Sequence, residues 1–196
     1  MKRISRVYIA ALALVLLVFG SAQGGKNIIR NGNFEKFTGG EPAGWETTNI
    51  PNMLTAVSQS TNYHSGKSAV RCEVKDFSGT KMAGMLCLKN LRLSGSLLQL
   101  KGFYLLHPVG NDVGFLSVTF KNTNNSTIGS VEEFLSKSTG GYVLVTREAK
   151  IPNGTTMMDL HLTILAGKGS NAPHEGSYVL IDDLEGIVTT EEAPTH

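Results

Sequence analysis

The sequence predicts an all-β domain in which two antiparallel sheets pack face to face. Many short stretches alternate apolar and polar residues with the period of a β-strand. Turns rich in Gly and Asn separate them, and residues 131–137 are the one stretch that could hold a helical turn. The 196 residues are 41% hydrophobic and 17% charged, which suits one globular domain with a sizeable core. Together these features are typical of a β-sandwich.

The expected elements follow one another with short connections. A first short strand at 27–30 leads into a turn at 31–35, and a loop at 38–44 is dense in Gly and Pro. Modest strands are expected at 47–50 and 54–58. The stronger strand candidates, which show clear alternation or β-branched runs, lie at 68–75, 81–88, 98–107, 116–121, 127–131, 142–149, 158–164 and 177–187.

Residues 1–22 are predicted to be a signal peptide. Lys2, Arg3 and Arg6 form a basic start, residues 7–19 are almost wholly apolar, and small residues precede an expected cleavage after or near Ala22. The apolar run is shorter than the roughly 20 residues of a membrane span. An uncleaved anchor is the alternative. We therefore expect a secreted, periplasmic or cell-surface protein, with a domain at 23–188, a polar tail at 189–196 and no membrane span after cleavage.

The charge of the mature chain argues against nucleic acid as a partner. The whole chain has 18 Lys and Arg against 16 Asp and Glu. Cleavage removes three of the positive charges, which leaves 15 against 16 and a formal net charge of −1. No basic run or patch stands out in what remains, so the electrostatic attraction that binds nucleic acids is missing.

Cys72 and Cys87 are the two cysteines of the chain. In an exported protein a pair of cysteines most simply forms a disulfide. A hairpin of strands 68–75 and 81–88 would bring the two sulfur atoms opposite each other, and the bridge would contribute about 3 kcal/mol. The alternative is a pair of buried free thiols.

Acidic residues mark both ends of the mature chain. Asn31-Gly32-Asn33-Phe34-Glu35 combines a turn, for which Gly32 suits a positive φ, with an aromatic residue and a carboxylate. Asp182 and Asp183 lie inside an apolar strand, where carboxylates need a cation or hydrogen-bond donors. We expect the two ends to lie side by side and to share a cation. The alternative is that these carboxylates bond to backbone N–H groups or to Lys and Arg.

Four motifs, in this order, resemble the landmarks of carbohydrate-binding modules of the family 4, 9 and 22 type: Asn31-Gly-Asn-Phe-Glu35, Pro42-Ala-Gly-Trp45, His64-Ser-Gly-Lys67-Ser-Ala-Val-Arg71 and Ile181-Asp-Asp-Leu184. The resemblance covers nearly the whole mature chain and implies a jelly-roll sandwich of the galactose-binding-domain-like fold. It also implies a structural Ca²⁺ ion.

The resemblance assigns roles to individual residues. Glu35 and one of Asp182 and Asp183 would bind the Ca²⁺ ion, together with backbone carbonyls near Ser65 and Lys67. Trp45 would pack in the core rather than stack on a sugar.

Polar side chains on the outward side of three strands form the candidate binding surface. They oppose the apolar face of their strands: Gln99, Lys101, Phe103, Ser117, Thr119, Asp159, His161 and Thr163. If these strands are neighbours in one sheet, the side chains form a polar floor with one aromatic ring that could bind a sugar. The alternative is an ordinary solvated sheet face.

Signatures of catalysis are missing from the sequence. Gly66-Lys67-Ser68 ends like a phosphate-binding loop but lacks its first glycine, and neither a nucleophile elbow nor a zinc-protease His pair occurs. The sequence therefore predicts an exported, non-catalytic protein that binds a polysaccharide or other glycan. The alternative is a stand-alone extracellular or envelope module that binds another surface protein, which the small number of candidate exposed aromatics favours. A third hypothesis is a small hydrolase or lyase on a jelly roll, for which the chain offers no motif.

Overall fold

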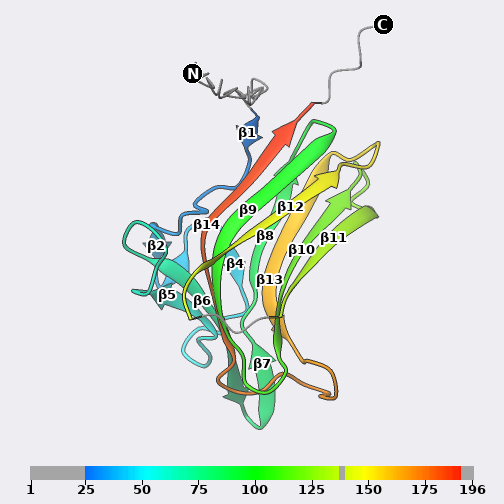
Figure 1. The fold of residues 1–196 in the computed structure, drawn as a ribbon. Helices are drawn as coiled ribbons and strands as arrows, with labels where there is room; N and C mark the ends of the chain where they lie inside the picture. Colours follow the sequence, from blue (N-terminus) through cyan, green and yellow to red (C-terminus); the bar gives the residue numbers. More distant parts are fainter. Residues whose placement is uncertain (1–24, 137–139, 191–196) are drawn as a thin grey trace, which may run out of the picture.

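The computed structural model describes residues 25–136 and 140–190, and they form two antiparallel sheets packed face to face (Figure 1). The first, called sheet I, has the strand order β12 (Val143–Lys150), β9 (Leu97–His107), β14 (Tyr178–Thr189), β6 (Ala69–Phe77) and β5 (Val57–Ser60). In addition, β1 (Lys26–Asn27) pairs with β14, and β7 (Thr80–Ala83) pairs with β6.

The second sheet, called sheet II, has the order β11 (Thr127–Leu135), β10 (Val113–Lys121), β13 (Met157–Leu165), β8 (Leu86–Arg92) and β4 (Glu46–Thr47). A small ribbon of β2 (Phe37–Thr38) and β3 (Glu41–Pro42) lies outside both sheets. The described part of the chain contains no helix, and hence none long and apolar enough to cross a membrane. The predicted signal peptide at 1–22 and residues 191–196 of the tail lie outside the described residues.

The core lies between the sheets and follows the alternation of the sequence. Apolar side chains of β9 and β14 in sheet I meet those of β10 and β13 in sheet II. The side chains of Phe34, Phe120 and Leu160 are among the largest that are fully buried, and burial of each contributes about 1.5–3 kcal/mol. The predicted two-sheet sandwich is confirmed.

Residues 81–88 were expected to form one strand but form parts of two. β7 completes a hairpin with β6, and the chain then crosses at Gly84 to sheet II, where β8 begins. Gly84 passes so close to Ala56 that a Cβ atom at this position would lie 2.2 Å from the Ala56 carbonyl oxygen. The crossing therefore needs glycine.

The predicted disulfide is wrong for the same reason. Cys72 belongs to the core on the sheet I side, whereas Cys87 lies on β8 in sheet II, and both are buried free thiols. Strands 68–75 and 81–88 do not pair along their length, so the sulfur atoms are not brought opposite each other. Burial raises the pKa of Cys72 to about 12, which keeps this thiol protonated.

The stretch 131–137, which could have held a helical turn, is a strand as far as Leu135. β11 continues through Leu135, and residues 137–139 lie outside the described part. Glu132 and Phe134 alternate with Val131 and Leu135, and the latter two contact the core. The period-2 pattern therefore extends four residues further than the sequence analysis assigned.

The opening turn and the closing strand lie side by side, as predicted. β1 pairs with β14, and the Gly32 carbonyl accepts a hydrogen bond from the Leu184 N–H at 2.8 Å. The positive φ angles fall at Asn31 (48°) and Phe34 (46°) rather than at Gly32, which was expected to have one. Gly32 is needed instead for a close approach, because a Cβ atom there would lie 1.9 Å from the Leu184 carbonyl oxygen.

Trp45 packs in the core, as the resemblance implied. It is 7% exposed, its ring centroid lies 5.3 Å from that of Phe34, and its indole N–H donates to the Arg30 carbonyl at 3.2 Å. The tryptophan is thus not a surface for sugar stacking.

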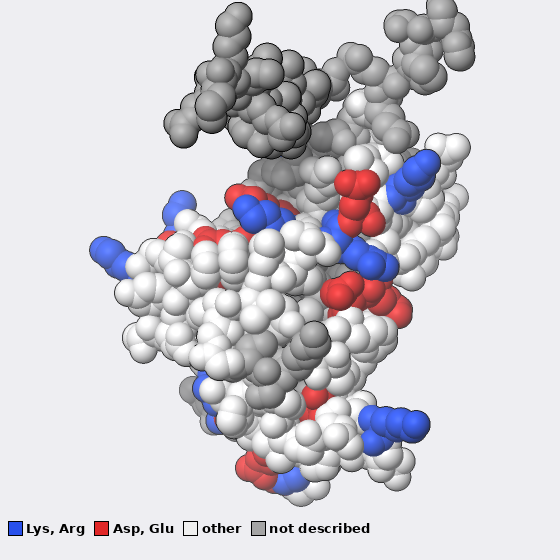
Figure 2. Space-filling model, in the orientation of Figure 1, with Lys and Arg blue, Asp and Glu red and all other residues white. Residues whose placement is uncertain are grey.

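Charged side chains of both signs are interspersed on the face shown in Figure 2, with a wide uncharged area between them. Charged side chains of the protein also pair with one another, as in the contact of the Lys81 ammonium with Asp76 and Glu175 at 2.7 Å each. This face carries no single-sign patch of the kind that attracts nucleic acid.

Candidate functional site

The residues of the predicted polar floor are divided between the two sheets. Gln99, Lys101 and Phe103 lie on β9 of sheet I, whereas Thr119 on β10 and His161 on β13 lie in sheet II. The connection between β9 and β10 crosses from one sheet to the other, so two strands adjacent in sequence show their outward sides on opposite faces of the sandwich. The prediction of one continuous floor is therefore wrong.

The three sheet I residues make contacts within the protein. The Gln99 amide donates to Glu148 at 3.1 Å, and the Lys101 ammonium lies 3.7 Å from the Glu185 carboxylate. The Phe103 ring is covered by the His64 imidazole, with 3.5 Å between ring centroids and 10° between planes. The ring that was expected to contact a sugar is thus occupied by a side chain of the protein.

The outer face of sheet II brings together residues from all five of its strands. One row across the sheet runs from Glu132 to Ser117, His161, Cys87 and Glu46. A neighbouring row contains Phe134, Phe115 and Thr163. Since alternate residues of a strand share a face, both rows lie opposite the core.

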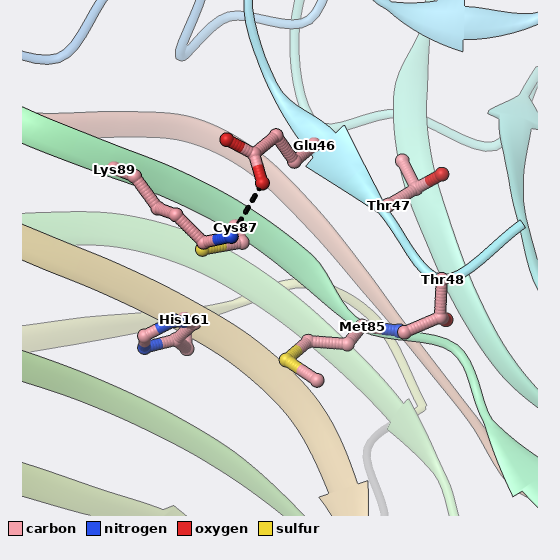
Figure 3. A pocket seen from close by; sticks show the side chains of 7 residues that line it. All are labelled: Glu46, Thr47, Thr48, Met85, Cys87, Lys89 and His161. Atoms are coloured by element: carbon pink, nitrogen blue, oxygen red, sulfur yellow. Dashed lines mark hydrogen bonds and ion pairs between the residues drawn. The ribbon is translucent and has the colours of Figure 1, made fainter.

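A hollow opens where β4, β8 and β13 meet (Figure 3). Its volume is about 240 Å³, and it is lined by Glu46, Thr47, Thr48, Met85, Cys87, Lys89 and His161. The Lys89 ammonium and the Glu46 carboxylate are 2.6 Å apart and form an ion pair at its rim. The hollow thus offers polar groups of several kinds beside the apolar Met85 side chain.

Burial sets the protonation state of two of the lining residues. It lowers the pKa of His161, with smaller effects of both signs from nearby charges, so the imidazole is neutral at pH 7 and can both donate and accept a hydrogen bond. It raises the pKa of Cys87 to about 11, so this thiol stays protonated and is a poor nucleophile.

Asp159 lies beside this hollow, but its carboxylate is already bonded to protein groups. Burial alone would raise the pKa of Asp159, but the Asn90 N–H at 2.8 Å and the Lys121 ammonium outweigh it, and the pKa is lowered. Its side chain is 7% exposed, so its charge holds β8, β10 and β13 together rather than meeting a ligand. Thr119 lies next to it across the β10–β13 pair.

Two aromatic rings complete the outer face of sheet II. Phe134 on the edge strand β11 is 54% exposed, and its ring centroid lies 5.1 Å from that of Phe115 on β10. Neither residue was predicted: Phe134 lies in the stretch considered for a helical turn, and Phe115 lies just before the strand expected at 116–121. The alternation of Ser130, Glu132 and Phe134 with buried or half-buried residues was the signal that could have found them.

Glu35, Asp182 and Asp183, the predicted Ca²⁺ ligands, meet at the 64–68 segment. A Glu35 oxygen accepts the N–H groups of Lys67 at 2.8 Å and Ser68 at 3.1 Å. The buried Asp182 carboxylate accepts N–H groups of His64, Ser65 and Asp183. Burial raises the pKa of Asp182, although these three hydrogen bonds oppose the increase.

The donors around Glu35 and Asp182 are backbone N–H groups, as in the alternative interpretation, whereas Asp183 contacts side chains. Asp183 accepts hydrogen bonds from the His64 imidazole at 2.7 Å and the Ser65 hydroxyl at 3.0 Å. N–H groups of Ser65 and Lys67 face the carboxylates where carbonyl oxygens were expected. Within residues 25–136 and 140–190, no three His, Cys, Asp or Glu side chains are placed to hold a metal ion together. As arranged, the carboxylates are satisfied by protein donors, and calcium stays a prediction from the sequence.

Comparison with protein-family models and with curated proteins gives no match. Among solved structures, the xylan-binding CBM22-1 domain of Paenibacillus barcinonensis Xyn10C matches with a TM-score of 0.52 and 13% identity, over 88% of this chain and 100% of that one. TmCBM61 bound to β-1,4-galactotriose matches with a TM-score of 0.51 and 16% identity, over 83% and 99%. The enzymatically active domain of bacteriophage CBA120 tailspike protein 4 matches with a TM-score of 0.60 and 12% identity, over 82% of this chain but 21% of that one.

At these identities the likeness concerns the fold. The chain has the β-sandwich fold of carbohydrate-binding modules, as the four sequence motifs indicated. It spans about a fifth of the tailspike chain, at 21%, and nearly all of each of the two modules.

Proposed function

We propose that the protein binds a glycan along the outer face of sheet II, and that this face performs no reaction. The observation that carries the proposal is the contact of the exposed Phe134 ring with the half-buried Phe115 ring, on the same face as the hollow around His161. A sugar presents apolar C–H groups on the flat side of its ring and hydroxyl groups at its edge. Aromatic rings can contact the first, and convergent polar groups can hydrogen-bond the second.

The extent of the face favours an oligosaccharide over a single sugar. β11 and β4 are separated by four strand spacings, which is about 19 Å across the sheet. Phe134 lies at one side of this span, and Glu46 and the hollow lie at the other. A chain of sugars crossing the strands would contact the aromatic pair, pass Ser117 and reach His161.

The similar structures support the ligand class. TmCBM61 was solved with β-1,4-galactotriose and the CBM22-1 domain is described as xylan-binding, and each corresponds to this chain over almost its whole length. The fold hosts many functions, so the likeness supports glycan binding without naming the sugar.

The test is affinity electrophoresis of the protein through gels that contain one polysaccharide each, followed by calorimetry on any that retard it. Phe134→Ala and His161→Ala are expected to weaken binding at least about tenfold each, which corresponds to about 1.4 kcal/mol. Leu144→Ala is the matched control, because Leu144 is 49% exposed but lies on the edge of sheet I. Failure of every polysaccharide to retard the protein, or an equal effect of Leu144→Ala, would overturn the proposal.

The proposal includes export of the protein, because it would encounter a free polysaccharide outside the cytoplasm. The support is the basic start and apolar run within residues 1–22. Amino-terminal sequencing of the protein from its own host should find a chain that begins after or near Ala22. A chain that keeps Met1 and stays in the cytoplasm would contradict export.

A further inference from the structure

Two loops at the end of the sandwich away from the chain termini bring a serine, a histidine and an aspartate together. One loop joins β9 to β10, and the other joins β13 to β14, drawn in orange at the bottom of Figure 1. The Ser170 hydroxyl lies 3.4 Å from His174 Nε2, and His174 Nδ1 lies 2.9 Å from Asp112 Oδ1. A nucleophilic Ser–His–Asp triad has the same order of contacts: the serine hydroxyl meets Nε2 of the histidine, and Nδ1 meets the carboxylate.

The carboxylate is buried and held in place. The Asp112 side chain is fully buried, and its Oδ2 atom accepts the His174 N–H and the Ser177 hydroxyl at 2.6 Å each. Burial alone would raise the pKa of Asp112, but the hydrogen bonds from Ser177 and His174 outweigh it, and the pKa is lowered. An ionised Asp112 accepts a hydrogen bond from the Nδ1–H group, which favours the tautomer whose Nε2 is free to accept a proton from Ser170.

The two loops are locked against each other by close packing. A Cβ atom at Gly167 would lie 1.6 Å from the Asn111 carbonyl oxygen, so glycine is required at this contact. The Ser177 hydroxyl, which donates to Asp112, also accepts the Val109 N–H at 2.7 Å. Asp112 and His174 are therefore positioned by several contacts that do not involve Ser170.

The carboxylate of the cluster is buried, whereas the imidazole and the hydroxyl are partly exposed. Asp112 is buried, whereas 42% of the His174 side chain is exposed and Ser170 is half-buried. Within the described residues, the N–H group of Asn171 makes no hydrogen bond. The N–H group of the residue after a nucleophilic serine is one that can stabilise the oxyanion of an acyl transfer.

A second cluster with the same three residue types lacks this geometry. There the Ser65 hydroxyl and His64 Nδ1 both bond to Asp183, so the serine contacts the carboxylate and not the imidazole. The Ser65 hydroxyl thus bonds to a carboxylate instead of an imidazole, which makes Ser65 a matched control inside the same protein.

We propose that Ser170, His174 and Asp112 form a second site that hydrolyses carboxylic esters. The Ser170 oxygen attacks the ester carbonyl carbon while its proton passes to His174 Nε2. The bond to the alcohol oxygen then breaks, the alcohol leaves with that proton, and the acyl group stays on Ser170. Water attacks this acyl-serine with His174 as the base, which releases the carboxylic acid and restores the hydroxyl.

The first test is covalent labelling of the full chain with an alkyl fluorophosphonate, which loses fluoride when a nucleophilic serine attacks its phosphorus. Mass spectrometry of peptides is expected to find the label on Ser170. Ser65→Ala should label at the wild-type rate, and His174→Gln should label at least about 100-fold more slowly. An unlabelled protein, or a label on another serine, would overturn the assignment, and this outcome needs no variant to fold.

The second test is hydrolysis of p-nitrophenyl acetate by the wild-type protein and by Ser170→Ala, with melting curves to show that both are folded. If Ser170→Ala hydrolyses the ester no faster than the uncatalysed background, the proposed site is supported. If its hydrolysis rate equals that of the wild type, the proposal is overturned. Asp112 is a positioning residue, so Asp112→Asn is expected to change the ¹⁵N NMR signals that report the His174 tautomer as well as the rate. A variant with an unaltered tautomer and rate would exclude that role. Neither readout involves a glycan.

Discussion

Asp159 shows at the scale of one residue how charge stabilises this sandwich. Its carboxylate lies between β13, on which it stands, Lys121 on β10 and the Asn90 N–H on β8. Removing a partner of such a buried carboxylate lowers the stability of the fold, because water does not replace the lost hydrogen-bond donor. The residue thus ties three neighbouring strands of sheet II below the proposed glycan face.

The lowered pKa of Asp159 predicts a loss of stability in acid. Because the pKa in the folded protein lies below the usual value of 3.8, the folded state holds the ionised form more strongly than the unfolded state does. The stability that this group contributes is fully present above pH 3.8 and is lost as the pH falls through the folded value. The free energy of unfolding in urea, measured from pH 6 downward, should fall less steeply for Asp159→Asn than for the wild type.

Lys121→Met is the matched control for this prediction. It removes the ammonium but leaves the Asn90 donor, so its pH dependence should lie between those of the wild type and of Asp159→Asn. Identical curves for all three proteins would show that Asp159 does not contribute to the acid response.

Single residues also show where sequence analysis succeeds and where it fails. The carboxylates near both chain ends were found because charge in an apolar strand demands partners, and the partners turned out to be N–H groups. The contact of Ser170 with His174 could not be found, since two polar residues in a loop carry no periodic signal. Asp112, the third member of that cluster, is distant in sequence and meets them only through folding.

At the scale of elements, local alternation fixed the strands but not their partners. The stronger strand candidates correspond to β6 and β9 to β14, because burial on one face demands alternation. The division of 81–88 at Gly84 and the placement of β9 and β10 in different sheets depend on contacts between distant segments. For that reason the predicted disulfide and the continuous polar floor failed together.

The crossing between β7 and β8 predicts a strong effect of Gly84→Ala. The added Cβ atom would meet the Ala56 carbonyl oxygen at 2.2 Å and the Glu73 nitrogen at 2.9 Å, both of them backbone atoms. Relief of such a clash requires a backbone shift, for which overpacking costs of about 1–3 kcal/mol are usual. Thermal unfolding should therefore show a lower Tm.

Gly140→Ala is the control for the crossing. Nothing lies within 4 Å of a Cβ atom at Gly140, and the φ angle of this glycine is not positive. The Tm of Gly140→Ala should therefore stay close to that of the wild type. Equal melting temperatures for Gly84→Ala and the wild type would mean that the close approach to Ala56 does not constrain the fold.

At the scale of the whole molecule, protein donors join the first turn to the last strand. The Leu184 N–H bonds to the Gly32 carbonyl, and the N–H groups of 64–68 satisfy Glu35 and Asp182. From this arrangement we expect melting curves recorded in EDTA and in CaCl₂ to coincide. A Tm that rises with calcium and loses this response in Glu35→Gln would instead establish the ion predicted from the sequence.

The dimensions of sheet II predict how glycan affinity depends on chain length. Phe134 on β11 lies two strand spacings, about 10 Å, from His161 on β13, so a monosaccharide in the hollow does not reach Phe134. Calorimetry with a length series of the best-bound glycan should show the affinity rising with each added sugar until the chain spans both. His161→Ala should weaken binding of short and long chains, whereas Phe134→Ala should weaken only the chains long enough to reach β11. An affinity that is independent of length, or a Phe134→Ala effect equal at every length, would place the glycan elsewhere on the molecule.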